Sequence, residues 1–270
     1  MATRSPAPPR PVRRALPQPA RKPRRKRRFR LLRRLLAFLI ILGLLAAIGY
    51  AYVLQVYAPG LRSEARQIPN VVHAQLAQHG DRYISTSQMS PDLKNAIVAI
   101  EDRRFYYHPG IDPIGMVRAA WVNFHTKQVD QGGSTLEEQL VKRSLVPDNG
   151  SIRAKLKQLA LAWAVDQEFS KQQILGLYLN AAYYGQGAYG ADSAARVYFG
   201  TDALHLDLSQ AAFLAALPQA PSIFGAHPTS QPVVDRQHTV LDDMVADQYI
   251  TSAQARVAEA EQLHFAFSNP

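Results

Sequence analysis

Twelve consecutive residues, from Glu101 to Asp112, carry a high density of side chains that could do chemistry. The segment EDRRFYYHPGID opens with two adjacent acids and holds two arginines, three aromatic rings, a histidine and a glycine. The apolar run before it, between Leu93 and Ile100, stops where the charges begin. We therefore expect a buried helix to deliver the Glu101 carboxylate, partly desolvated, to the edge of a cleft, where a general acid or base is usually mounted. A solvated carboxylate at a helix end is the alternative.

A second segment with chemical potential is the loop Gly132-Gly133-Ser134-Thr135. Ser134 followed by Glu137 fits a capping box, which predicts a helix that opens here and ends before Pro147. The free backbone N–H groups at such a helix start favour anions, phosphates especially. A plain turn and cap is the alternative interpretation.

Several cations follow this loop. Lys142 lies near the far end of the same predicted helix, and Arg153, Lys155 and Lys157 lie on the next one. A carboxylate base, an anion-binding helix start and several cations suit a transfer reaction in which a sugar hydroxyl attacks an anomeric carbon and expels a phosphate-type leaving group. A lysozyme-like hydrolase must instead protonate a poor leaving group and usually needs a carboxylate pair, for which Glu101 has no obvious partner in the sequence.

The net charge of +10 over 270 residues belongs to one end of the chain. Residues 1–34 hold fourteen Lys and Arg and no acid, so the remainder carries a net charge of −4. A globular part without a basic surface gives little support to nucleic-acid binding. The chain has no cysteine, which excludes disulfides and cysteine chemistry.

An uncharged apolar run over residues 35–56 is long enough to span a bilayer as a helix. The basic residues just before it predict an amino terminus in the cytoplasm and a catalytic domain on the outer face of the cell membrane. A cleaved signal peptide is the alternative, but its apolar region would be shorter. The tail, residues 1–34, is typical of a disordered segment that sets topology or holds anionic lipid headgroups.

We expect a membrane-proximal connector over 57–89, with a short strand near Tyr83–Ser85, and then a mainly α domain over 90–270. Capping residues and apolar spacing predict its helices. The predicted helices begin after Ser90, Asp112, Ser134, Ser151 and Ser170, and further ones cover 208–217, 232–248 and 252–262.

These residues resemble the glycosyltransferase domain of class A penicillin-binding proteins and of monofunctional peptidoglycan transglycosylases. Five ordered blocks between about Ser90 and Leu241 carry the resemblance. The blocks are Ala99–Phe105 with His108, Gly110 and Asp112; Gln131–Thr135 with Gln139 and Lys142; Ser170-Lys171 with Tyr178-Leu179-Asn180; Tyr183–Gly200; and Leu217–Ser222.

The resemblance implies a lysozyme-like lobe, a smaller membrane-facing lobe that includes Ile114–Phe124, and one transmembrane helix in front. The substrates would be lipid II and the growing lipid-linked glycan strand, and Glu101 would be the general base of an inverting transfer. The residues implied to hold substrate are Asp102, Phe105, His108, Ser134, Thr135, Gln139, Lys142, Arg153 and Lys155. Apolar groups of the membrane-facing lobe would enter the lipid interface; for Trp121 and Phe124 an ordinary core position is the alternative.

The chain departs from the family pattern at several positions. Glu138 replaces a Gln, Arg143 an Asn, and Ala154 an Arg, whose charge Arg153 would supply from one place earlier. Gln158 stands where the family has its second important glutamate, and an amide can hydrogen-bond but cannot carry charge. No cofactor is required by this chemistry; a divalent cation, Mg²⁺ or Mn²⁺, stays open, although Gln158 disfavours a tightly held ion.

Three hypotheses follow: a working peptidoglycan glycosyltransferase, a membrane-anchored lipid II or glycan-binding protein with weak or no catalysis, and a lysozyme-like cell-wall hydrolase. The chain contains no Ser-x-x-Lys or Lys-Thr-Gly, so we expect no penicillin-binding transpeptidase activity. The expected partners are lipid II, the glycan strand and the bilayer, and other cell-wall synthesis proteins stay open as further partners. We expect no binding of nucleic acid.

Overall fold

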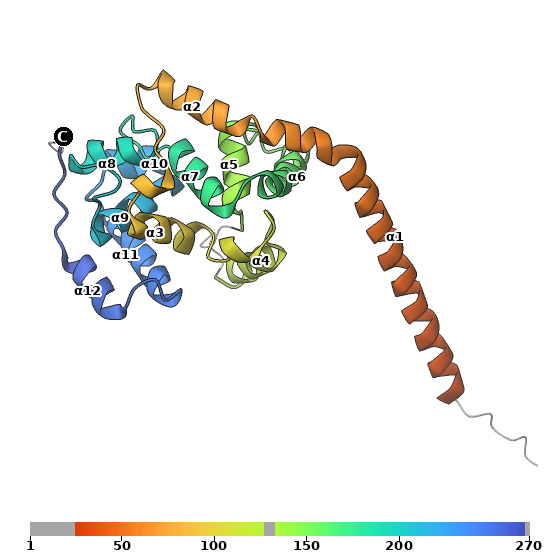
Figure 1. The fold of residues 1–270 in the computed structure, drawn as a ribbon. Helices are drawn as coiled ribbons and strands as arrows, with labels where there is room; N and C mark the ends of the chain where they lie inside the picture. The colour runs from red at the N-terminus through yellow and green to blue at the C-terminus, as the bar shows by residue number, and fades with distance from the viewer. Residues whose placement is uncertain (1–24, 127–132, 268–270) are drawn as a thin grey trace, which may run out of the picture. The chain divides into compact units, whose positions relative to one another are not determined.

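The structure is a computed structural model that describes residues 25–126 and 133–267 (Figure 1). The described part is mainly helical, as predicted, and its one extended pairing is an isolated antiparallel bridge between Tyr183 and Tyr189. The α-helices are α1 (Arg25–Ala65), α2 (Ile68–Gln78), α3 (Pro91–Glu101), α4 (Pro113–Thr126), α5 (Leu136–Ser144), α6 (Ile152–Glu168), α7 (Lys171–Ala181), α8 (Ala191–Phe199), α9 (Leu208–Ala216), α10 (Pro221–Ala226), α11 (Gln231–Ala246) and α12 (Ser252–Ala260). Three short 3₁₀ turns join them, η1 (Thr86–Gln88), η2 (Phe105–Tyr107) and η3 (Leu217–Gln219).

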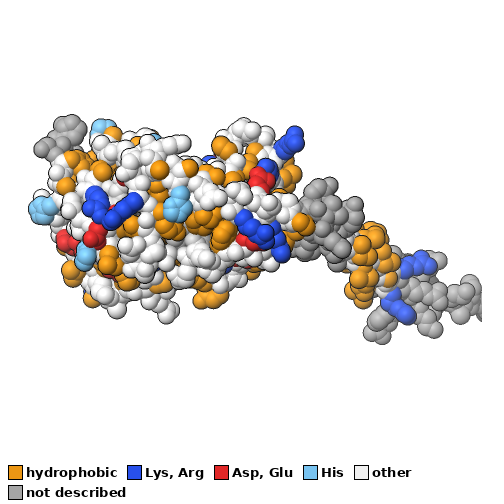
Figure 2. All heavy atoms as spheres, turned by 45° about the horizontal axis from the view of Figure 1, so that its top comes forward, with side chains coloured by type: hydrophobic (Ala, Val, Ile, Leu, Met, Phe, Trp, Pro, Cys, Tyr) orange, Lys and Arg blue, Asp and Glu red, His pale blue; other side chains and the backbone are white. Residues whose placement is uncertain are grey.

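The chain divides into two compact units, Met1–Leu54 and Gln55–Pro270. The first contains most of α1, whose described side chains between Leu35 and Ile48 are apolar and exposed, and Figure 2 shows them in orange beside basic groups in blue. Within the predicted anchor, residues 35–56, the side chains at positions 46–47 and 49–56 lie outside the described part of the structure. Most of the predicted tail, residues 1–24, lies outside it as well. Among the described residues, no helix has enough apolar length to cross a membrane.

The core of the second unit is built around α9, an Ala- and Leu-rich helix. All residues from Ala211 to Leu217 are buried, and α3 and α11 pack on this helix. Burying a side chain such as Phe213 or Leu214 contributes about 1.5–3 kcal/mol each. This packing fixes α3, and with it the position of Glu101 at the end of α3.

Side-chain caps begin several of the predicted helices where expected. The hydroxyl of Ser90 accepts a hydrogen bond from Asp92 N–H, that of Ser151 from Ala154 N–H, and that of Ser170 from Gln173 N–H. Each cap satisfies a backbone donor that the helix itself leaves without a partner.

The predicted connector over 57–89 is instead part of the second unit's core. Helix α2 buries Ile68, Val72 and Leu76, which are spaced four residues apart on one face. The strand predicted near Tyr83–Ser85 does not form. The side-chain amide of Asn180 serves both backbone groups of Ile84, accepting from its N–H at 3.0 Å and donating to its C=O at 2.9 Å, which gives an extended segment its partner without a sheet.

Candidate functional site

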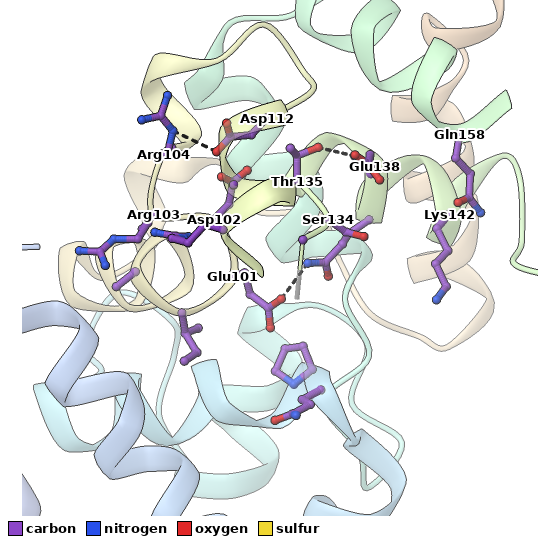
Figure 3. A pocket seen from close by; sticks show the side chains of 18 of the residues that line it. Glu101, Asp102, Arg103, Arg104, Asp112, Ser134, Thr135, Glu138, Lys142 and Gln158 are labelled. Atoms are coloured by element: carbon purple, nitrogen blue, oxygen red, sulfur yellow. Dashed lines mark hydrogen bonds and ion pairs between the residues drawn. The ribbon is translucent and has the colours of Figure 1, made fainter. Parts of the chain in front are cut away.

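An open cleft of about 1060 Å³ lies at the carboxyl end of α3. Its walls come from the end of α3, the helices α5 and α6, the Gly115–Val122 part of α4, and the Arg236–Asp243 part of α11. Figure 3 shows Glu101 on one side of this cleft and Lys142 with Gln158 on the other. Most of the cleft lining thus comes from the segments that the sequence marks as chemically active.

Glu101 is half-buried and is held by one specific hydrogen bond. The side-chain amide of Gln139 donates to Glu101 Oε2 at 2.7 Å, and the Tyr178 hydroxyl donates to the amide oxygen of Gln139 at 3.3 Å. This second contact fixes which end of the Gln139 amide faces the carboxylate. Within the described residues, no protein group donates to Glu101 Oε1, so this oxygen is available to accept a proton from a bound hydroxyl.

At the start of α5, where the sequence predicts an anion site, two backbone N–H groups bind side chains of the protein. Asp102 Oδ2 accepts from Leu136 N–H at 3.0 Å, and the Thr135 hydroxyl accepts from Glu138 N–H at 3.2 Å. The helix start does attract a negative charge, as expected, but that charge is the Asp102 carboxylate. Two backbone donors of this helix start are therefore already used, and the binding of a substrate phosphate here stays a prediction. Of the predicted loop, Gly132 lies outside the described residues.

Behind the cleft wall lies a buried polar network centred on Lys171. Its ammonium donates to Glu137 Oε1 at 2.6 Å and to the His108 carbonyl at 2.8 Å, pairs with Asp166 at 2.8 Å, and lies 4.6 Å from the centre of the Phe105 ring. Glu137 is fully buried, and this burial raises the pKa of its carboxyl. The residues of this network lie outside the cleft lining and support the side chains that do line the cleft.

One group of described residues could supply three metal ligands, namely Asp102, His108 and Glu137, whose ligand atoms lie within 4.8 Å of one another. Each is already engaged: His108 Nε2 lies 3.0 Å from both Asp102 oxygens, and the Lys171 ammonium neutralises Glu137. The Lys171 ammonium already supplies positive charge to this group, although His108 Nδ1 and Glu137 Oε2 are buried without a hydrogen-bond partner.

The far side of the cleft carries paired cations. Lys142 is exposed and lies 3.4 Å from Asp148, whereas Lys155 pairs with the buried carboxylate of Glu138. The guanidinium of Arg143 lies 5.5 Å from the centre of the Tyr178 ring. Lys142 and Lys155, both predicted to contact the substrate, thus line the same side of the cleft.

Gln158 lines the cleft but is almost fully buried, and its amide donates to the Val146 carbonyl at 2.9 Å. It therefore ties α6 to the loop that follows α5. Arg153, predicted to replace the charge lost at Ala154, is exposed and lies outside the cleft lining, since the two residues point about 100° apart around the helix.

The remaining predicted contacts divide into two groups. Ser134 and Gln139 line the cleft. Phe105 and His108 are buried and do not line the cleft. Thr135 does line it, but its hydroxyl is engaged within the protein, because it also donates a hydrogen bond to the Gly110 carbonyl at 2.8 Å.

Two cleft residues on α11 were missed from the sequence. Arg236 is half-buried. Its burial lowers the pKa of the guanidinium, and this effect outweighs the negative charges of Glu101 and Asp243, which would raise that pKa. Burial also raises the pKa of Asp243. Arg236, Thr239 and Asp243 are spaced three and four residues apart, which indicates that they share one face of a helix. Nothing in the sequence indicates that this face meets the end of α3.

Helix α4 presents an apolar row to solvent. Ile114, Val117 and Trp121 are 62%, 71% and 66% exposed, so the core alternative for Trp121 is wrong. The side chain of Phe124 lies outside the described residues.

Comparisons with known proteins identify the family of this chain. The family model described as Transglycosylase matches residues 69–245. Penicillin-binding protein 1A from Aquifex aeolicus is 37% identical over 75% of this chain and 28% of its own length, and the one from Vibrio cholerae is 35% identical over 85% and 30%. The crystal structure of penicillin-binding protein 1A from Haemophilus influenzae overlaps with a TM-score of 0.41 and 22% identity, over 68% of this chain and 18% of that chain. This chain thus spans less than a third of the length of these curated relatives. The family model covers well over half of the chain, which therefore belongs to the transglycosylase family.

Proposed function

We propose that the chain is a membrane-anchored peptidoglycan glycosyltransferase that polymerises lipid II into glycan strands. The observation that carries this proposal is the Glu101 carboxylate at the end of α3, oriented by Gln139 at 2.7 Å and open to the cleft through its other oxygen. Membership of the transglycosylase family supports the same substrate class.

In the proposed reaction, Glu101 takes the proton of the acceptor sugar hydroxyl as its oxygen attacks the anomeric carbon of the donor. The new glycosidic C–O bond forms as the bond from that carbon to the lipid pyrophosphate breaks, with inversion at the carbon. The pyrophosphate leaves as an anion, so the step needs one base and positive charge but no general acid. The exposed ammonium of Lys142 and that of Lys155 line the part of the cleft where this charge would be received.

We further propose two contacts with the membrane. Residues 35–56 would cross it once and place the domain on the outer face, and the apolar row of α4 would enter the lipid interface in which both substrates are anchored. Because the chain has no cysteine, one cysteine introduced at Ala2 or at Ser268 would report the side of each end to an impermeant thiol reagent.

The decisive experiment is polymerisation of purified lipid II by the full chain. We expect long glycan product from the natural chain and none from Glu101→Gln, while the matched change at an exposed carboxylate, Glu261→Gln, keeps the activity. Absence of product from the natural chain would refute the proposal. Shortening of preformed strands would instead support the hydrolase hypothesis.

A second candidate is a lipid II-binding protein with little catalysis. Gln158 favours it, since an amide locked on the Val146 carbonyl offers the substrate no charge where the family has a glutamate. Saturable binding of lipid II by the natural chain without any product would decide for this candidate. We also propose that the chain does not react with β-lactams, and covalent labelling by a fluorescent penicillin would contradict this.

A further inference from the structure

Glu138 combines burial with incomplete pairing on the wall of the cleft. Its side chain is 2% exposed; one oxygen binds Lys155, and the other, Oε1, is buried without a hydrogen-bond partner. A buried carboxylate oxygen left without a donor costs free energy, so this pair is poorly arranged for stability alone.

Lys155 is the accessible member of the pair. Its side chain is 46% exposed and lines the cleft. An ammonium has three donors, of which Glu138 takes one, so two remain for a ligand in the cleft. A lysine held by a fixed carboxylate also loses less rotamer freedom when it binds an anion than an unrestrained lysine does.

The pair involves the same two helices as the departures from the family pattern. The resemblance has an amide at 138 on α5 and a carboxylate at 158 on α6, whereas this chain has the carboxylate at 138 and the amide at 158. Lys155 lies one turn before Gln158 on α6 and reaches across to Glu138. The Gln158 amide serves the Val146 carbonyl, which a carboxylate could not do.

We infer that Glu138 is a positioning residue that fixes the Lys155 ammonium in the cleft, where it receives the pyrophosphate group of the lipid-linked substrate. The inference rests on the proposed function for the identity of that substrate. Glu138 acts through Lys155, because its own unpaired oxygen is buried and does not reach solvent.

The test is a double-mutant cycle on binding rather than on turnover. Fluorescent lipid II in detergent micelles is titrated with the full chain carrying Glu101→Gln, which removes turnover, and with the further changes Glu138→Gln, Lys155→Met and both together. The matched control is Glu64→Gln, because Glu64 pairs with Lys157 of the same helix at 2.7 Å, outside the cleft.

We expect Glu138→Gln and Lys155→Met each to weaken binding about tenfold, as for the loss of one charge-assisted contact, and the double change to weaken it no further. Glu138→Gln should keep or raise the melting temperature, since it removes a buried charge, and Glu64→Gln should bind like the parent.

Unchanged binding in Glu138→Gln would overturn the inference, as would additive effects in the double variant or a matching loss in Glu64→Gln. Failure of the proposed function has a different signature, namely no glycan product from the chain with Glu101 intact.

Discussion

At the scale of single residues, Gln158 joins two segments of the chain. We predict that Gln158→Glu, which restores the family's residue, destabilises the protein by about 1–3 kcal/mol. The change removes the donor to the Val146 carbonyl and places a carboxylate in a site that is 3% exposed. Urea unfolding followed by circular dichroism measures the effect.

The matched control is Gln172→Glu, the same chemical change at an exposed position of α7. It should alter the free energy of unfolding by less than about 0.5 kcal/mol. A large gain in polymerisation rate from Gln158→Glu, with stability unchanged, would contradict the structural role and show that the natural chain is impaired at this position.

The sequence allowed the place of Glu101 to be predicted but not the role of Gln158. The apolar face of α3 and the charges after it locate a carboxylate at a helix end, which is a local property. Gln158 bonds a backbone carbonyl twelve residues away, and backbone acceptors carry no signature in the sequence. The same limitation hid Arg236, whose neighbours come from another helix.

At the scale of elements, Gly110 sets the spacing between the Glu101–Asp112 segment and α6. Its φ is +81°, and a Cβ there would lie 2.4 Å from the Ala162 carbonyl oxygen. Gly150 has a similar φ of +73° with nothing within 4 Å of such a Cβ. We predict that Gly150→Ala costs about 1 kcal/mol of backbone strain and that Gly110→Ala costs clearly more. Equal melting temperatures for the two variants would show that the close approach to α6 is tolerated.

The buried network behind the cleft makes stability depend on pH. Burial alone would lower the pKa of His108, but its hydrogen bond with Asp102 and the charges of Asp102 and Glu137 outweigh burial and the opposing Lys171, so the pKa is raised. A raised pKa means that the stabilisation is complete below the unfolded value of about 6.5 and is lost as pH rises through the folded value.

We therefore expect the urea midpoint of the natural chain to fall as pH rises above about 6.5, and His108→Gln to flatten this slope. The exposed His264 provides the matched control, and His264→Gln should leave the slope in place. A steeper slope in His108→Gln would argue against the network as its source.

The sequence predicted the first residue of a helix correctly where the cap depends on local residues alone. Where a contact with a distant residue selects the cap, the observed helix begins at another residue than predicted. Ser90, Ser151 and Ser170 cap as predicted. At α5 the cap is Thr135 and not Ser134, although both have a glutamate three residues later. The hydroxyl of Thr135 also donates to the Gly110 carbonyl, and this distant contact selects between two equivalent local signals.

At the scale of the whole molecule, the proposed membrane contact of α4 gives a spectroscopic prediction. The chain has two tryptophans, Trp121 and Trp163. In a Trp163→Phe background, we expect the emission of Trp121 to shift to the blue with anionic lipid vesicles, because its ring leaves water. Val117→Glu, at a side chain that is 71% exposed, should weaken this shift without lowering the melting temperature. No shift at saturating lipid would refute an interfacial α4.

The mainly helical class was predictable because caps and apolar spacing recur along the chain, whereas the extent of the second unit was not. Helix α2 carries a readable four-residue spacing but no cap that bonds through its side chain, so its segment looked like a connector. Helix α8 buries mostly alanines, and small side chains give a weak periodic signal.

The hydrogen bond from Leu136 N–H to Asp102 at the start of α5 has a mechanical consequence. Asp102 directly follows Glu101, and its bond to Leu136 N–H couples the end of α3 to the helix that carries Gln139. Glu101 and the Gln139 amide that donates to it are thus linked through the same contact, and we expect any opening of the cleft to move the opposite walls instead. Native-state hydrogen exchange should accordingly find the Leu136 amide among the slowest, and the first turns of α4 and α6 faster.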